Sequence, residues 1–322
     1  LSSFGVGRVS SLFVYPMSFD EFLTATGQEG LLRTKRNSSP TNPLPEAFYN
    51  RLVEAFRSYM LVGGMPEAVA TYMETGSYRY SSDIVNEIIQ GYQDDFAKYG
   101  AKANPLLLRQ TLISVAHQAG AKFVYSRVEG QYRSAEVKVA LEMLKDAGLI
   151  IPTYHTDANG VPLGAEINER VVKYLIHDTG VLLGILGIDD DIDDSIKEMM
   201  VADSINLVDK GHVAEMMAGL ELIKYSSPQK RHQLYYWQNM NKGTCAEVDY
   251  VIARSGSIVP IEVKSGVKGS MSSMYSLMRN PQKHIEMGIR CSLENFGTFE
   301  SPDGKKIDII PLYAISNLFA EK

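Results

Sequence analysis

Two carboxylates and a lysine interrupt two neighbouring apolar segments near the C-terminal end of the chain. Asp249 lies in the apolar run of residues 248–253, and Glu262 lies in a second run, residues 258–263, which Lys264 follows. An unpaired charge within an apolar strand is costly to bury, so these three residues are candidates for a chemical role. Carboxylate oxygens and an ammonium group suit a hard divalent cation and a phosphate group.

The two runs are predicted to form a β-hairpin. Both alternate apolar and polar residues with a period of two, and the polar segment 254–257 with Gly256 provides the turn between them. Glu262 and Lys264 are two residues apart and therefore point to the same face of their strand. We expect the hairpin to bring the carboxylate of Asp249 close to both of them.

The composition is that of a globular protein with more than one domain. The 322 residues are 45% hydrophobic and 22% charged, a length that favours two or three domains. The net charge of −6 gives no overall basic field, so nucleic-acid binding would need a local basic patch. Cys245 and Cys291 have neither metal-ligand spacing nor a disulfide framework, which predicts a cytoplasmic protein. No apolar run approaches the roughly 20 residues of a membrane span, so no membrane partner is expected.

The first hundred residues read mainly as helical hairpins. Ser18 is placed to cap a helix, Gly63 and Gly64 separate two helices, and Pro66 begins the second of them. Residues 35–45 are polar and rich in proline, which indicates a loop. The predicted elements are a strand at residues 12–15 and helices from residue 19, at 46–60, from residue 66 and at 82–99.

Residues 101–186 have the element order of a winged helix-turn-helix. The pattern predicts a helix at 105–117, a short helix or turn at 123–130, a helix at 135–147 capped by Ser134, and strands at 149–156 and 169–176. The third helix would present Arg133, Lys138 and Lys145 to DNA, but acidic residues stand beside them. The alternative is an ordinary solvated helix in a unit that docks a protein partner, because a fold does not dictate its function.

Residues 187–199 form an acidic linker, and residues 200–322 form the last unit. The patterns in this unit predict a helix at 206–225, strands at 234–237, 248–253 and 258–264, a mostly helical segment at 272–288 and a strand at 307–315. The overall fold class is therefore α/β and multidomain, with an αβββαβ order in the last unit.

This order and the motif residues resemble the PD-(D/E)XK superfamily of restriction endonucleases and Holliday-junction resolvases. The resemblance implies that Asp249, Glu262 and Lys264 are catalytic, and that Asp249 and Glu262 bind Mg²⁺ or Mn²⁺ with Glu215 from the preceding helix. Lys264 would stabilise the developing negative charge or orient the attacking water. The alternative is a degenerate nuclease-like domain in which the carboxylates and lysine neutralise one another. Glu247 is read as a flanking surface charge.

Across nearly the whole chain, the motifs resemble a prokaryotic family of AAA-type ATPases. The matching segments are GRVSSLFVYPMSFDEFL, GGMPEAV, KYLIHDTGVLLGILG and EVDYVIARSGSIVPIEVKSG. The family pattern is a P-loop domain, a helical lid, a winged helix and a restriction-endonuclease-like domain, so residues 1–100 would be the end of the ATPase core and the lid. Arg8 would lie near the nucleotide. No GxxxxGK[ST] phosphate loop is present, and the chain opens in mid-pattern at Leu1, so ATP binding is expected only in a longer parent protein.

The sequence is compatible with two functions. The first is a nucleic-acid-acting ATPase fragment with a Mg²⁺-dependent phosphodiesterase domain and a DNA-binding winged helix. The second is a non-enzymatic regulatory or assembly fragment that binds protein or DNA without cleaving it, either alone or as an oligomer. Residues 200–322 contain 14 Lys and Arg against 13 Asp and Glu, and this near-neutral charge favours the second. A cluster of Lys268, Arg279 and Lys283 around Lys264 would favour the first.

Overall fold

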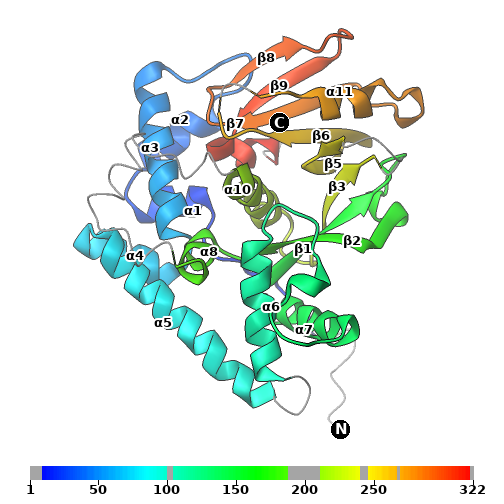
Figure 1. The fold of residues 1–322 in the computed structure, drawn as a ribbon. Coiled ribbons are helices and arrows are strands. Elements are labelled where there is room, and N and C mark those ends of the chain that lie inside the picture. Colours follow the sequence, from blue (N-terminus) through cyan, green and yellow to red (C-terminus); the bar gives the residue numbers. More distant parts are fainter. Residues whose placement is uncertain (1–8, 100–103, 188–210, 240–245, 267–268, 320–322) are drawn as a thin grey trace.

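The computed structural model describes residues 9–99, 104–187, 211–239, 246–266 and 269–319 (Figure 1). Within these ranges the architecture is mixed α/β, and the strands form two mixed sheets. The linker predicted at 187–199 lies almost wholly outside the described residues. A search of the described helices finds none that combines the length and the apolar character needed to cross a membrane.

The helical hairpins predicted for the first hundred residues are confirmed. Ser18 forms a capping box with Glu21, because the Ser18 side chain accepts from Glu21 N and the Glu21 carboxylate accepts from Ser18 N at 2.7 Å. Pro66 begins its helix at a position where a missing N–H costs nothing. The helices are α1 (Phe19–Ala25), α2 (Glu29–Arg36), α3 (Glu46–Val62), α4 (Pro66–Thr75) and α5 (Tyr78–Phe96).

The strand predicted at residues 12–15 is wrong. This segment has no regular secondary structure, because its main chain bonds to loops instead of to a neighbouring strand. Phe13 N donates to Pro228 O at 2.9 Å, and Met17 N donates to Gly64 O at 2.7 Å. The segment therefore joins the turn between α3 and α4 to the C-terminal half of the chain.

Gly64 must be a glycine for this contact to form. A Cβ at Gly64 would lie 2.3 Å from Met17 O and 2.9 Å from Met17 N, both of them backbone atoms. We expect Gly64→Ala to lower the free energy of unfolding by about 2–3 kcal/mol, because the backbone must shift to relieve the overlap. Urea denaturation followed by circular dichroism measures this change.

The matched control is Gly91→Ala in α5, where nothing lies within 4 Å of the added Cβ. This change should raise the free energy of unfolding by about 0.5–1 kcal/mol, because alanine favours a helix interior more than glycine does. Equal destabilisation by both substitutions would show that the Met17 contact is not what requires glycine at position 64.

The next unit has the predicted order of helix, short helix, helix and β-hairpin. The prediction that Ser134 caps the third helix is wrong, because Ser134 is the first helical residue and Glu136 instead accepts from Arg133 N at 2.8 Å. The elements are α6 (Pro105–His117), a 3₁₀ turn (Tyr125–Arg127), α7 (Ser134–Asp146), β1 (Ile150–Thr156) and β2 (Ile167–Ile176), followed by α8 (Thr179–Ile185).

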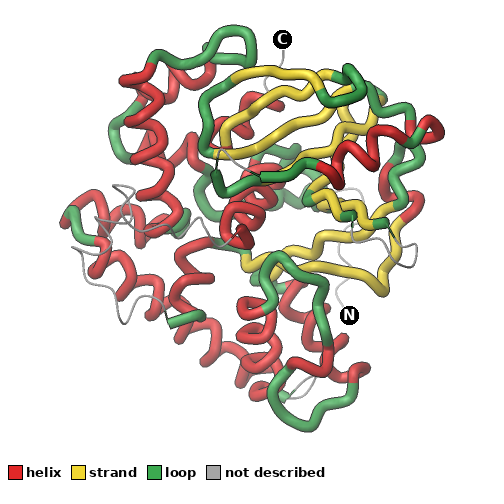
Figure 2. Tube along the Cα trace, turned by 45° about the horizontal axis from the view of Figure 1, so that its top comes forward, coloured by secondary structure: helices red, strands yellow, loops and turns green. Residues whose placement is uncertain are grey.

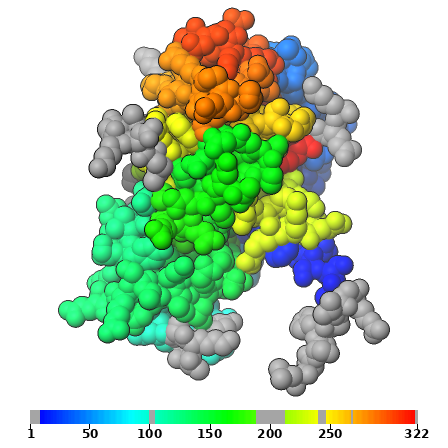
Figure 3. Space-filling view, turned by 90° about the vertical axis from the view of Figure 1, so that its right-hand side faces the viewer, coloured from blue at the N-terminus to red at the C-terminus, as the bar shows by residue number. Residues whose placement is uncertain are grey.

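The hairpin of β1 and β2 continues into the C-terminal half. β1 pairs antiparallel with β2 and parallel with β3 (Leu234–Gln238), which in turn pairs antiparallel with β4 (Glu247–Val248). The resulting sheet has the order β2-β1-β3-β4. In Figure 3 the green surface of β1 and β2 lies between the teal surface of α6 and α7 and the orange surface of the C-terminal segments.

The second sheet has the order β5-β6-β7-β9-β8. It confirms the predicted hairpin, whose strands are β5 (Tyr250–Arg254) and β6 (Ser257–Val263). The αβββαβ order is wrong in detail, because β4, β7 (Met287–Ser292) and β8 (Gly297–Glu300) are additional strands and β9 (Lys306–Pro311) ends before residue 315. The helix predicted at 272–288 is shorter, since α11 (Ser272–Arg279) stops before Pro281, where the missing N–H ends regular helix.

Helix α10 (Gly211–Lys224) packs against strands of both sheets and against α8 (Figure 2). Residues 213–223 of this helix are all buried, so no face of it is open to solvent, as expected for a buried helix. Ala214, Met217 and Leu220 are buried within its core. Glu215 and Glu221 are buried on the same helix and therefore need polar partners.

Candidate metal site

The hairpin brings the two predicted carboxylates to the same end of its ladder. The ladder of the two strands ends at the pair Tyr250 and Ile261, and Asp249 and Glu262 are the residues directly next to that pair. The negative charge of Asp249 acts on Glu262, as expected for neighbouring carboxylates. Asp249 precedes β5 in the short break after β4, and its Oδ2 accepts from Val263 N at 2.7 Å. This bond fixes the Asp249 carboxylate against the end of β6.

Of the two carboxylates, Glu262 has an oxygen without a partner and a raised pKa. Its Oε1 accepts from Lys264 Nζ at 2.6 Å, whereas its Oε2 is buried and has no hydrogen-bond partner. Burial, together with the negative charge of Asp249, raises the pKa of Glu262 to about 7. Burial also raises the pKa of Asp249, although the bond from Val263 N opposes that shift. A buried oxygen without a partner is expected to bind a cation or a proton.

Glu215 reaches the same region from α10 but is bound to a lysine that the sequence did not predict for the site. Lys173 Nζ on β2 lies 2.7 Å from Glu215 Oε1 and 2.5 Å from Glu247 Oε1. Burial raises the pKa of Glu215 to about 8 in spite of Lys173. Burial would lower the pKa of Lys173, but the charges of Glu215 and Glu247 outweigh it and raise that pKa. The interpretation of Glu247 as a flanking surface charge is therefore wrong.

Both missed residues leave a weak signal in the sequence. Lys173 is the only charge in the apolar run of residues 171–176, and Glu247 is two residues before Asp249, on the side of the strand that Asp249 would share. Neither pattern names its partner, because Lys173 and Glu215 are 42 residues apart. Their meeting depends on how β2 packs against α10.

Arg290 is a further buried charge beside the pair. It is opposite Glu262 in the parallel ladder of β6 and β7, so both side chains lie on one face of the sheet. Its Nε donates to Glu294 Oε2 at 2.7 Å and its guanidinium donates to Gly266 O at 3.0 Å. Arg290 was not predicted for the site because no strand was predicted at β7: the helical segment was expected to reach residue 288, and no element was assigned to the residues directly after it.

The basic residues that were expected around Lys264 have other surroundings. Lys283 bonds to the loop at Asp157 and Asn159, Arg279 pairs with Asp303, and Lys268 lies outside the described residues.

The charges and the ligand atoms of the carboxylate cluster show whether it could bind a divalent cation. Four carboxylates, those of Glu215, Glu247, Asp249 and Glu262, face two lysines, which leaves a formal charge of −2 when all are ionised. Among the described residues, no three His, Cys, Asp or Glu side chains are arranged to hold one ion together. Mg²⁺ commonly binds through only one or two carboxylates, with water and phosphate oxygens completing its coordination. Asp249 and Glu262 fit that mode, and Glu215 does not join them while Lys173 holds it.

The predicted DNA-binding residues lie on or next to α7, and one of them is paired with a carboxylate. Arg133 precedes the first turn of the helix and is exposed, as is Lys138. Lys145, seven residues after Lys138 and so on the same helix face, pairs with Glu142. Arg8, the predicted nucleotide-binding residue, lies outside the described residues.

Two family models match separate parts of the chain. Residues 53–192 match a domain of unknown function (DUF8612). Residues 210–315 match a second domain of unknown function (DUF4143), which is often found in proteins associated with AAA ATPases. No curated protein and no solved structure matches the chain.

The DUF4143 match therefore covers Glu215, Glu247, Asp249, Glu262 and Lys264, while Lys173 falls in the DUF8612 match. The cluster of charges joins residues from both matched regions.

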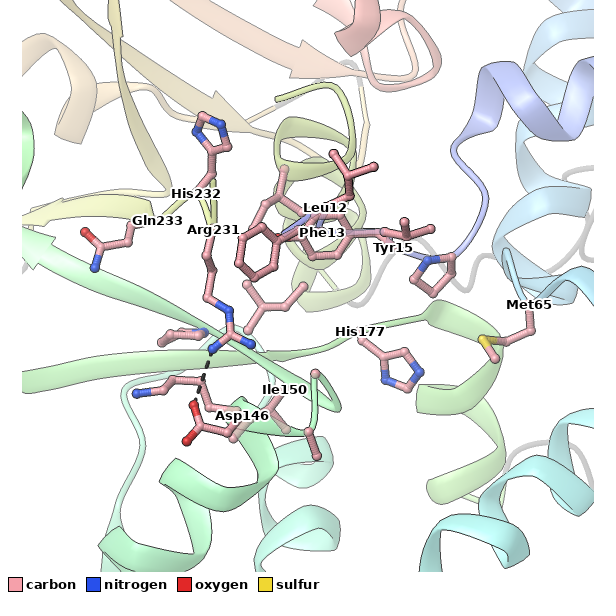
Figure 4. Close-up of a pocket in the computed structure, with 18 of the residues that line it drawn as sticks. Leu12, Phe13, Tyr15, Met65, Asp146, Ile150, His177, Arg231, His232 and Gln233 are labelled. Carbon is pink, nitrogen blue, oxygen red and sulfur yellow. Dashed lines mark hydrogen bonds and ion pairs between the residues drawn. The ribbon is translucent and has the colours of Figure 1, made fainter. Parts of the chain in front are cut away.

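A separate cavity of about 630 Å³ lies between the N-terminal segment, β1 and the loop before β3 (Figure 4). Arg231 and Asp146 point toward one another across it, 3.4 Å apart, and Arg231 also lies over the ring of Phe13. His177 is bonded to Leu149 O and to the Tyr92 hydroxyl. His232 also lines the cavity, and its Nε2 is buried without a hydrogen-bond partner. The cavity shares no residue with the carboxylate cluster.

Proposed function

We propose that the C-terminal region is a Mg²⁺- or Mn²⁺-dependent phosphodiesterase domain of a nucleic-acid-acting protein related to AAA-type ATPases. The observation that carries this proposal is the pair of Asp249, just before β5, and Glu262 on the neighbouring strand β6, with one oxygen of Glu262 buried and without a partner. The unit of α6, α7, β1 and β2 would act as a winged helix that places the domain on DNA through Arg133, Lys138 and Lys145.

Asp249, Glu262 and Lys264 would each have a separate role in hydrolysis. Asp249 and Glu262 supply the hard oxygen ligands, and the bond from Val263 N holds Asp249 in place. When bound, the ion would polarise the phosphodiester and lower the pKa of a water molecule. Lys264 is about one-fifth exposed, so its ammonium can turn from Glu262 to a phosphate oxygen and stabilise the charge that develops there. Hydrolysis adds water across one P–O bond and leaves a phosphate monoester and a hydroxyl.

A non-enzymatic function is the second candidate, and a specific observation favours it. Glu262 and Lys264 already form an ion pair at 2.6 Å, and Lys173 neutralises Glu215 and Glu247. A degenerate domain would retain such a network of paired charges. In that case the chain would bind protein or DNA without cleaving it.

Metal binding by the wild type and by Asp249→Ala distinguishes the phosphodiesterase function from the non-enzymatic function. We expect calorimetry to show Mn²⁺ or Mg²⁺ binding to the wild type and none to Asp249→Ala, because the ion loses one of two carboxylate ligands. Asp303→Ala, which removes an exposed carboxylate paired with Arg279, is the control and should bind metal as the wild type does.

Cleavage is tested with plasmid, linear and branched DNA in the presence of Mg²⁺. Lys264→Ala should retain the ion but lose about 10²–10³-fold in rate, the usual effect of removing one group that stabilises developing charge. No metal binding by the wild type would exclude the site. Cleavage that survives Asp249→Ala and Lys264→Ala together would place the chemistry elsewhere.

A further inference from the structure

Lys173 is a buried cation in the DUF8612 match, and its side chain contacts the carboxylates of Glu215 and Glu247 in the DUF4143 match. Its side chain is 1% exposed, and its ammonium bonds to both Glu215 and Glu247. The ammonium also lies 4.9 Å from the centre of the Tyr236 ring, a cation–π distance. Lys173 therefore has partners on α10, β3 and β4, although it belongs to β2.

The surrounding hydrogen bonds fix Lys173 to the position of the hairpin. Lys173 is opposite Thr153 in the β1–β2 ladder, and β1 continues through a parallel ladder into β3. Lys122, in the loop after α6, forms an isolated bridge with Lys173 on its other side. The backbone of Lys173 is therefore held on both sides, and its ammonium is directed to Glu215 on α10.

Stability alone does not account for a buried ion pair of this kind. The free energy needed to remove two charges from water is about as large as the free energy gained from their attraction. Replacing such a pair by apolar side chains of similar size therefore often leaves the stability of the fold unchanged. The cluster instead carries two carboxylates more than it has lysines, and Glu215 and Asp249 repel one another. The ammonium and a divalent cation would compete for the same negative charge.

We propose that Lys173 is an internal counter-cation that holds Glu215 away from the metal site and so limits the affinity of the site for a divalent cation. With Lys173 in place, Asp249 and Glu262 are the available ligands. Without the lysine charge, Glu215 would be released to the ion and the charge that repels the ion would be removed. Lys173 is a positioning residue, because it acts through Glu215. This inference rests on the proposed metal site.

Lys173→Met tests the inference, because methionine keeps much of the volume of lysine and removes its charge. In the metal-free protein we expect a lower melting temperature than in the wild type, since Glu215 and Glu247 lose their partner. Mn²⁺ should restore the melting temperature of the variant, and calorimetry should show Mn²⁺ affinity increased on the order of tenfold or more over the wild type. Glu215→Gln added to Lys173→Met should return the affinity toward the wild-type value.

Lys224→Met is the matched control. Lys224 is also a buried lysine, lies on α10 and pairs with Glu221 at 3.6 Å, but it has no contact with the metal site. Its substitution should lower the melting temperature equally with and without Mn²⁺. If Lys173→Met does not fold, Glu247→Gln is added to remove one carboxylate charge with the lysine, and its affinity is compared with that of Glu247→Gln alone.

The outcomes separate this inference from the proposed function. Wild-type binding with unchanged affinity in Lys173→Met would overturn the regulatory role of Lys173 and leave the metal site intact. Absence of Mn²⁺ binding in the wild type and in both Lys173 variants would overturn the metal site itself, and the inference with it. Mn²⁺ binding by the wild type that becomes tighter when Lys173 is replaced would support both.

Discussion

Glu262→Gln should abolish metal binding and at the same time stabilise the metal-free protein above pH 7. Glutamine resembles the protonated carboxyl, so the variant no longer has to ionise a buried group. Because the pKa of Glu262 is raised to about 7 in the folded chain, the folded state holds a proton that the unfolded state releases near pH 4.5. The stability contributed by this proton is complete below pH 4.5 and is lost as the pH rises through 7.

The expected gain of Glu262→Gln over the wild type is about 2–3 kcal/mol at pH 8 to 9 and near zero at pH 4.5. Urea denaturation at both pH values without metal measures it. Mg²⁺ should raise the melting temperature of the wild type and leave that of the variant unchanged.

Glu142→Gln is the control for this experiment, because Glu142 is half exposed and pairs with Lys145 at the surface of α7. Its effect should stay below about 1 kcal/mol at either pH, as for other exposed ion pairs. Destabilisation of Glu262→Gln at pH 8 would mean that the ionised Glu262–Lys264 pair stabilises the fold, and would favour the non-enzymatic alternative.

Lys35→Met should have the largest effect on stability. Lys35 on α2 is fully buried and donates to Asp20 on α1, and also to Ser316 Oγ at 2.6 Å near the C-terminal end. Removing the ammonium leaves Asp20 buried without its closest cation, with Arg36 and the hydroxyls of Tyr225 and Ser316 as its remaining side-chain donors. We expect the free energy of unfolding to fall by about 3–5 kcal/mol, the usual cost of breaking a buried pair.

Urea denaturation with circular dichroism checks this value. Asp20→Asn added to Lys35→Met should recover part of the loss, because the variant then buries no uncompensated carboxylate. Mn²⁺ affinity should be unchanged, since neither residue belongs to the carboxylate cluster. A loss below 1 kcal/mol for Lys35→Met would show that water or Arg36 replaces the lysine at Asp20.

Local patterns predicted the helical part of the chain well. The helix of residues 46–62 follows from its apolar spacing, and the helix from Pro66 follows from proline at its first position. The strand expected at 12–15 failed because strand formation requires a partner edge, and this segment instead bonds to Pro228 and Gly64. The strand at 287–292 was missed because its residues are buried between two other strands, where alternation between apolar and polar residues is weak.

Local sequence patterns were enough to predict the hairpin that brings Asp249, Glu262 and Lys264 together, because these residues are close in the chain and strand periodicity sets their faces. The groups around these three residues depend on long-range packing. Lys173 and Glu247 entered the cluster through the packing of β2 and β4 against α10, a contact between segments 42 and 74 residues distant from Lys173. That packing bound Glu215 to a lysine and left Glu262 with an oxygen that has no partner, because burial and long-range pairing depend on the whole fold.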